Sequence, residues 1–168
     1  MKHDDVDAMV PRWQDSGLSS SLIADLELSK RMSRLNMLFE TAIKAELADL
    51  GLTYAEFDVL AALARTGPPH QLKPSDLTKS LYLTSGGTSN VLQRLTTAGY
   101  VERAANAGDA RSRWVQLTPE GLSLANTALE VSGKAHEEVM AGVPEETVRK
   151  AADALREVLL AVGRRRFR

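Results

Sequence analysis

Short polar side chains recur along residues 84–98 and could form hydrogen bonds with the bases and phosphates of a nucleic acid. In chain order the candidates are Ser85, Thr88, Ser89, Asn90, Gln93 and Arg94. An ordinary exposed helix usually carries pairs of Glu and Lys four residues apart, whereas residues 84–98 contain no acidic residue. Gly86 and Gly87 would lower the stability of a helix here, but they let a phosphate approach its N-terminus closely. The pattern therefore favours a helix that contacts DNA over a plain surface helix.

A second group of charged residues follows at Asp109-Ala110-Arg111-Ser112-Arg113. An acidic side chain two residues before an arginine can hold its guanidinium in one pose, which lowers the entropy lost on binding. Taken alone, Asp-x-Arg is usually a surface ion pair. When the motif follows, in the sequence, a helix of the kind just described, it indicates an arginine that enters the minor groove of DNA. Arg113 places a further positive charge nearby.

The charges are unevenly distributed along the chain, although the net charge is only −1. Residues 73–113 hold six basic and three acidic residues, a net of +3, whereas residues 1–72 have a net of −4. A local basic face matters more for DNA binding than the overall charge. Chance clustering on a solvated surface is the alternative, and charge alone does not exclude it.

The elements expected around these residues are two short helices, a turn between them, and a β-hairpin. Helices are predicted over residues 74–81 and 84–98, and alternating apolar residues predict strands over 100–103 and 113–117. Helix, turn, helix and hairpin define a winged helix-turn-helix, in which one helix fits the major groove. We therefore predict a mainly α fold with a small β-hairpin, in which a winged helix-turn-helix is joined to a long-helix dimerisation region.

A long amphipathic helix is predicted over residues 21–50, with Ser20 or Ser21 as its N-cap and Gly51 at its end. Its apolar stripe, with spacings of three and four, consists of Leu28, Met32, Leu35, Phe39, Ile43, Leu47 and Leu50. At 1.5 Å per residue such a helix is about 45 Å long, more than the width of a small domain. A stripe of this length indicates burial against a second copy of the chain.

Capping signals define the remaining helices. Thr53 and Glu56 have the spacing of a capping box, and Pro11 begins a short helix within residues 8–15. Thr118 and Pro119 begin a helix that is expected to end near Gly142. A last helix begins after Pro144, and its apolar side chains, expected to face inward, are Val148, Ala151, Leu155, Val158, Leu159 and Val162.

Several classes of function are disfavoured by composition. A chain of 168 residues without cysteine, with 43% hydrophobic residues, forms one domain and has no disulfide or thiolate metal site. His3, His70 and His136 lie far apart, so we expect no metal, and no pattern of nucleophile with base or phosphate loop indicates an enzyme or a cofactor. No apolar run is long enough to cross a membrane and no secretory signal is present, so we expect a cytoplasmic protein.

Over residues 20–163 the sequence resembles the MarR family of bacterial transcription regulators. The matching motifs are Leu52-Thr53-x-x-Glu56-Phe57-x-Val59-Leu60, Leu77-x-x-x-Leu81, Thr84-Ser85-Gly86-Gly87-Thr88, Arg94-Leu95-x-x-x-Gly99-Tyr100-Val101, Asp109-x-Arg111-Ser112-x-Trp114-x-Gln116-Leu117-Thr118 and Pro119-Glu120-Gly121. Each motif is weak alone, but the set is specific.

The resemblance implies a homodimer that binds a palindromic double-stranded DNA operator, most often as a repressor, and releases it when a small, often aromatic and anionic ligand binds. It implies that Arg111 is the wing-tip arginine and Asp109 its orienting partner. It also implies an N-terminal extension (residues 1–19), dimerisation helices (20–50 and 119–168) and a DNA-binding lobe (51–118).

An N-terminal helix with Trp13 is similar to a urate-responsive subgroup of this family, whose Asp and wing Arg match Asp58 and Arg103. The subgroup's ligand-binding arginine in the recognition helix is replaced here by Val91, so the effector is left open. The candidate effector-binding residues are Trp13, Arg34, Asp58 and Arg103. Trp13 could instead attach the N-terminal helix by packing, and Asp58 could pair with Arg34 or Arg103 for structural reasons.

The alternative hypothesis for the same fold is a winged-helix module that binds a protein and responds to no ligand. Such a module would lack a wing arginine and a recognition face of Ser, Asn and Gln. Both features are present, which favours the DNA-binding regulator.

Overall fold

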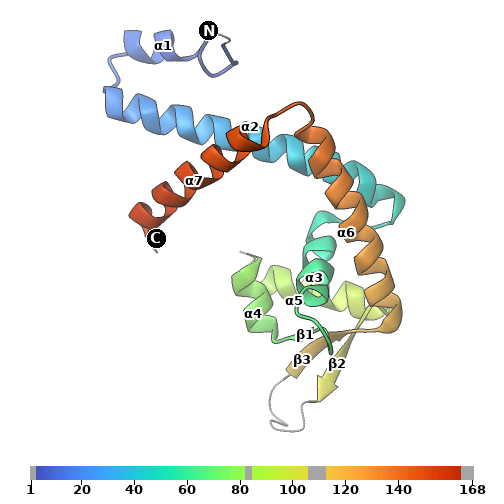
Figure 1. The fold of residues 1–168 in the computed structure, drawn as a ribbon. Coiled ribbons are helices and arrows are strands. Elements are labelled where there is room, and N and C mark those ends of the chain that lie inside the picture. The colour runs from blue at the N-terminus through green and yellow to red at the C-terminus, as the bar shows by residue number, and fades with distance from the viewer. Residues whose placement is uncertain (1–2, 82–84, 106–112, 164–168) are drawn as a thin grey trace.

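A computed structural model describes residues 3–81, 85–105 and 113–163. The elements in chain order are α1 (Val10–Asp15), α2 (Ser20–Asp49), α3 (Tyr54–Ala64), β1 (Gln71–Leu72), α4 (Pro74–Ser80), α5 (Ser85–Thr97), β2 (Val101–Ala105), β3 (Arg113–Leu117), α6 (Pro119–Val139) and α7 (Glu145–Val162). Figure 1 shows α2 running across the molecule, with α3, α4, α5 and the small sheet below one half of it. The predicted mainly helical winged helix-turn-helix is confirmed.

The long helix α2 extends over 30 residues, as its apolar stripe predicts. Its N-cap, however, is Ser19, whose hydroxyl accepts a hydrogen bond from the backbone N–H of Leu22, rather than Ser20 or Ser21. Ser19 has extended backbone angles, which an N-cap requires, whereas Ser20 is already helical. Gly51 follows the helix with a φ of +67°, a left-handed conformation that favours glycine.

The core lies where α2, α3 and α6 meet above the sheet. The predicted capping box of α3 is present, because Thr53 and Glu56 each accept a hydrogen bond from the other's backbone N–H. The largest fully buried apolar side chains of the core are Ile43, Leu47, Leu60, Leu63, Leu77, Leu95, Val59 and Val101. Through α3 and α6, this core joins α5 and the sheet to the C-terminal half of α2.

The sheet has three antiparallel strands in the order β1-β3-β2, not the two of the predicted hairpin. Gln71 and Leu72 pair with Gln116 and Val115, and so tie the segment before α4 to the wing. The sequence does not reveal β1 because only two residues pair, in a short segment between Pro69 and Pro74.

The start of α6 packs against the backbone of Tyr100, which lies between α5 and β2. Thr118 caps α6 by accepting from the N–H of Gly121, and the Thr118 N–H donates to the carbonyl of Tyr100. A Cβ atom on Gly121 would overlap that Tyr100 carbonyl, so only glycine fits at this position of α6. The helix ends at Val139, three residues before the predicted end at Gly142.

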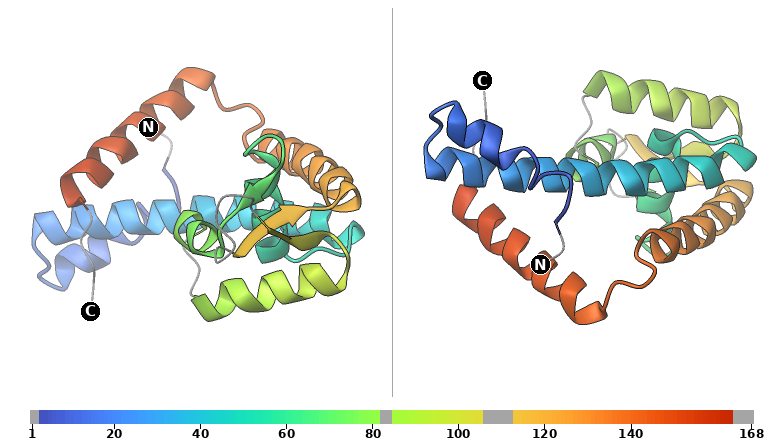
Figure 2. Two further views of the ribbon diagram at one scale, coloured as in Figure 1. Left: turned by 90° about the horizontal axis from the view of Figure 1, so that it is seen from below. Right: turned by 90° about the horizontal axis from the view of Figure 1, so that it is seen from above.

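The apolar side chains of α7 are exposed, which corrects the expectation that they face inward within the chain. No residue of this fully described helix is buried, and Leu159 is 69% exposed. Figure 2 shows α7 standing apart from α6, so that α2, α6 and α7 outline an open triangle. Other large exposed apolar residues lie on α2, namely Leu22, Met32, Leu35, Met37 and Leu38. Within the described chain, the length and apolar composition needed to cross a bilayer do not occur together in any helix.

Candidate nucleic-acid interface

The outward side of α5 carries four of the predicted DNA-contacting residues. Ser89, Asn90, Gln93 and Arg94 are all exposed; the first three lie within the central turns of the helix, and Arg94 begins its last turn. Ser85 is the first residue of α5. Because the three uncharged side chains can donate and accept hydrogen bonds, they can contact base edges or phosphates without repelling a polyanion.

Thr88 does not belong to this outward side, although the sequence predicts it there. It is 1% exposed, and its Oγ1 lies 3.0 Å from Oγ1 of Thr78 on α4. A threonine can occupy a buried position when its hydroxyl is hydrogen-bonded. Val91 is also buried, at 9% exposure, so this position of α5 packs in the core.

Arg94 is placed by an acidic residue of another helix. Its Nη2 lies 3.1 Å from Oε1 of Glu56, a buried residue of α3. The spacing of the two residues in the sequence gives no sign of this pair, because they are distant along the chain. Arg94 is therefore partly committed to a contact within the molecule.

The wing consists of β2 and β3, which pair from Val101–Leu117 to Ala105–Arg113. Asp109 and Arg111, the predicted wing-tip residues, lie outside the described residues. Arg113 is the first residue of β3. β2 begins shortly after α5 ends, and Figure 1 shows β2 and β3 below that helix.

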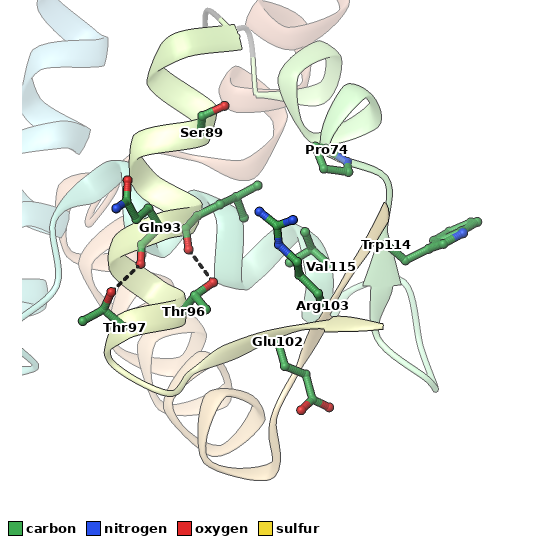
Figure 3. Close-up of a pocket in the computed structure, with 10 residues that line it drawn as sticks. Pro74, Ser89, Gln93, Thr96, Thr97, Glu102, Arg103, Trp114 and Val115 are labelled. Carbon is green, nitrogen blue, oxygen red and sulfur yellow. Dashed lines mark hydrogen bonds between the residues drawn. The ribbon is translucent and has the colours of Figure 1, made fainter. Parts of the chain in front are cut away.

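A cleft of about 500 Å³ lies between α5 and the wing strands. Ser89, Leu92 and Gln93 line it from α5, and Arg103 and Trp114 line it from the strands. Figure 3 shows Arg103 directed from β2 towards α5 while the neighbouring Glu102 points away, as expected for adjacent residues of a strand. In the described part of the chain no carboxylate lies within 4.0 Å of the Arg103 guanidinium, which leaves it able to bind an anion.

Trp114 is one of the lining residues of this cleft and also contacts the residue directly before α4. The Nζ atom of Lys73, directly before α4, lies 5.2 Å from the centroid of the Trp114 ring, a cation–π geometry. The Trp114 Nε1 atom is buried and has no hydrogen-bond partner among the described residues. The indole therefore links the wing to the segment that begins the helix-turn-helix.

The four candidate effector residues are not gathered in one cavity of the described chain. Arg103 lines the cleft beside α5, whereas Arg34 lines a groove of about 300 Å³ between α2 and the N-terminal segment. Trp13 is half-buried on α1, and its carbonyl accepts a hydrogen bond from the Leu18 N–H.

Asp58 makes no ion pair with Arg34 or Arg103, contrary to the structural alternative considered for it. It is half-buried on α3, and burial raises the pKa of its carboxyl. The positive charge of Arg65 lowers that pKa, and the negative charge of Glu40 raises it further. The carboxyl is thus partly desolvated, and no ion pair joins it to a cation of the described residues.

Arg31, by contrast, pairs with three acidic side chains. Its guanidinium contacts Asp4 at 2.8 Å, Asp7 at 2.9 Å and Glu27 at 2.9 Å, so it fastens the N-terminal segment to α2. Val6, which lies between the two aspartates, is 5% exposed. We call residues 4–15 the N-terminal strap.

Comparison with known proteins supports a common ancestry for this architecture. Residues 50–112 match the sequence model of the MarR family. The chain is 32% identical over 115 residues to the HTH-type transcriptional regulator PecS of Dickeya dadantii, covering 68% of this chain and 69% of PecS. It is 31% identical over 120 residues to the HTH-type transcriptional repressor Rv2887 of Mycobacterium tuberculosis, covering 71% of this chain and 84% of the relative.

Two similar crystal structures contain ligands. A MarR variant from Escherichia coli in complex with operator DNA has a TM-score of 0.72 and 25% identity, covering 84% of this chain and 99% of that chain. The Rv2887 protein of Mycobacterium tuberculosis in complex with salicylic acid has a TM-score of 0.62 and 28% identity, covering 79% of this chain and 96% of that chain.

Proposed function

This chain belongs to the MarR family of DNA-binding transcription regulators, and from that premise we propose that it is a homodimeric repressor whose palindromic operator is released when a small aromatic acid binds. Family membership also makes it a regulator and not an enzyme. The observation that carries the proposal is the exposed, acid-free side of α5, where Ser89, Asn90 and Gln93 face outward. We assign these side chains to the major groove, and the wing arginines Arg111 and Arg113, with Asp109, to the minor groove.

Operator binding is tested by a mobility shift with the DNA upstream of the chain's own gene, repeated at rising salt. Asn90→Ala or Gln93→Ala should relax the preference for one base pair by about 1–3 kcal/mol if the contact is bidentate. Asn126→Ala is the matched control, because Asn126 is exposed on α6, away from the proposed interface. The absence of any shift at low salt, on any intergenic fragment, would favour the protein-binding alternative.

The proposed dimer joins the exposed apolar faces of α2 and α7. Full burial of a large apolar side chain contributes about 1.5–3 kcal/mol, and this chain leaves Leu35 at 40% and Leu159 at 69% exposure. A second copy would fill the open triangle seen in Figure 2 and cover these faces. Residues 20–50 and 119–168 then form the dimerisation region, and residues 51–118 form the DNA-binding lobe.

Dimerisation is tested by light scattering during gel filtration. Leu35→Glu and Leu159→Glu should each give monomers that bind DNA poorly, because a carboxylate would be buried without a partner. Lys150→Glu also adds negative charge to α7, but on its charged side, and should remain a dimer. Dimers of unchanged stability in both leucine variants would contradict the interface.

For the effector we propose the cleft between α5 and the wing. The Arg103 guanidinium supplies a cation for a carboxylate, and Ser89 supplies a hydroxyl. Leu92 and Trp114 also line the cleft and contribute apolar surface. Since Ser89 and Gln93 line the cleft and also face outward for DNA, a bound ligand would compete with the operator.

The effector site is tested by titrating salicylate and urate while following Trp114 fluorescence in a Trp13→Phe background. Arg103→Gln should abolish the response, whereas Arg34→Gln, which changes the groove beside the N-terminal strap, should leave it intact. If Arg34→Gln abolishes the fluorescence response and Arg103→Gln leaves it intact, the effector binds in the groove at Arg34 instead.

A further inference from the structure

Both carboxylate oxygens of Glu56 are bonded, and they bond to different parts of the molecule. Oε2 accepts hydrogen bonds from the backbone N–H of Thr53 at 2.8 Å and from its hydroxyl at 2.7 Å. Oε1 lies 3.1 Å from Nη2 of Arg94 on α5. Glu56 thus joins the beginning of α3 to the last turn of the helix that we assign to DNA.

The two partners of this ion pair are exposed to very different degrees. The Glu56 side chain is 8% exposed, whereas the Arg94 side chain is 61% exposed. Transferring a carboxylate out of water is unfavourable unless a cation or several donors compensate. Among the described residues, Arg94 is the one cationic side chain within 4.0 Å of Glu56. The exposed arginine is therefore paired with a buried acid that Thr53 also holds in place.

The position of Arg94 on α5 makes this constraint important for recognition. Arg94 is four residues after Asn90 and one after Gln93, so the three side chains lie on adjacent turns. Thr53, at the other end of the network, follows the turn that ends α2 at Gly51. The network therefore relates the orientation of α5 to the end of the proposed dimerisation helix.

We propose that Glu56 is a positioning residue for DNA recognition, which acts by holding Arg94 and with it the outward side of α5. The proposal rests on the proposed operator binding, and it narrows the set of side chains that read bases to Ser89, Asn90 and Gln93. Arg94 serves the orientation of the helix rather than the direct reading of a base.

The test is a double-mutant cycle on operator affinity with Glu56→Gln, Arg94→Gln and the double variant. Glutamine keeps the shape of Glu56 and can still accept from Thr53, but it loses the charge that attracts Arg94. We expect each single variant to bind the operator roughly tenfold more weakly, which corresponds to a coupling energy within the range for contacting residues. The double variant should be no weaker than the weaker single variant.

The salt dependence of binding separates positioning from direct contact. If Arg94 only positions α5, the slope of log affinity against log salt stays as in the wild-type protein for all three variants. If Arg94 binds a phosphate, Arg94→Gln lowers that slope by about 0.9 while Glu56→Gln leaves it unchanged, which would overturn the proposal. Arg94→Lys, which keeps the charge but not the planar fork, should recover only part of the affinity.

The exposed pair Glu130–Lys134 on α6, at 2.8 Å, provides the matched control. Glu130→Gln removes an ion pair outside the proposed interface and should leave operator affinity unchanged. If thermal unfolding shows that Glu56→Gln is unstable, the affinity and salt slope of Arg94→Gln alone decide the test. Arg94 is largely exposed, so this variant should fold normally. If the wild-type protein binds the operator and the effects of the two single variants on affinity are additive or absent, the inference is wrong. If the wild-type protein binds no operator, the proposed function itself is wrong.

Discussion

The side-chain oxygens of Thr78 and Thr88 lie 3.0 Å apart, and this contact joins α4 to the buried side of α5. The Thr78 hydroxyl also lies 2.9 Å from the carbonyl of Pro74, at the start of α4. A polar contact inside the core has a defined direction, whereas apolar packing tolerates sliding. The pair therefore fixes how the two helices of the helix-turn-helix cross.

Thr88→Val should destabilise the protein by about 1 kcal/mol, since valine keeps the shape of threonine but loses the hydroxyl. Urea unfolding, with an unchanged dependence on urea concentration, measures the loss. Ser89→Ala changes the next residue, which is exposed, and should stay within about 0.5 kcal/mol of the wild type. Equal effects of both changes would mean that the Thr78–Thr88 contact contributes nothing.

Gly121→Ala should destabilise the protein by about 1–3 kcal/mol, because the added Cβ would overlap the Tyr100 carbonyl and push α6 away from the segment between α5 and β2. Gly133→Ala lies in the same helix, with no atom within 4 Å of the added Cβ. It should stabilise the protein by about 0.5–1 kcal/mol through helix propensity. Changes of opposite sign in the melting temperatures of the two variants would confirm the close contact between Gly121 and Tyr100. An unchanged melting temperature of Gly121→Ala would refute it.

Asp58→Asn should stabilise the protein at pH 7. Burial raises the pKa of Asp58 in the folded state, so the folded protein favours the protonated carboxyl and loses stability as pH rises through that raised value. Asparagine does not ionise and avoids this loss. The stability gained by Asp58→Asn should therefore shrink as pH falls below the ordinary carboxyl range. A gain that is the same at every pH would show that ionisation is not its cause.

The N-terminal strap should detach at acid pH. A hydrogen bond from Arg31 is the main cause that lowers the pKa of Asp4 below its ordinary value of 3.8. The strap is therefore fully anchored above that value and is released as pH falls through the lowered pKa. Trp13 fluorescence anisotropy, in a Trp114→Phe background, reports the release.

Arg31→Met is the control for the strap, because methionine keeps an aliphatic chain but cannot pair with Asp4, Asp7 or Glu27. This variant should show low anisotropy already at pH 7 and no acid transition. A wild-type transition that persists in Arg31→Met would assign the change to another group.

Local signals in the sequence predicted the elements and most of the outward side of α5. The Thr53–Glu56 spacing gave the start of α3, and Gly51 marked the end of α2, because caps depend on residues within one turn of each other. Ser89, Asn90 and Gln93 were placed correctly on the outside.

The failures concern contacts between distant segments. Thr88 is polar and was assigned to the outside, since nothing in the sequence shows that Thr78 would satisfy its hydroxyl. The Arg94–Glu56 ion pair was not predicted, because the two residues belong to different helices and are distant in the sequence. The apolar stripe of α7 was recognised, but a stripe does not reveal whether the surface that covers it belongs to the same chain.

The bare α7 helix has a consequence for how the protein responds to its own abundance. In the proposed dimer the 18 residues of this helix gain their packing only on association, so unfolding and dissociation become one equilibrium and the melting temperature rises with protein concentration. Below the dissociation constant, the amount of operator-competent protein grows with the square of the total. A modest change in synthesis would then alter operator occupancy more than in proportion.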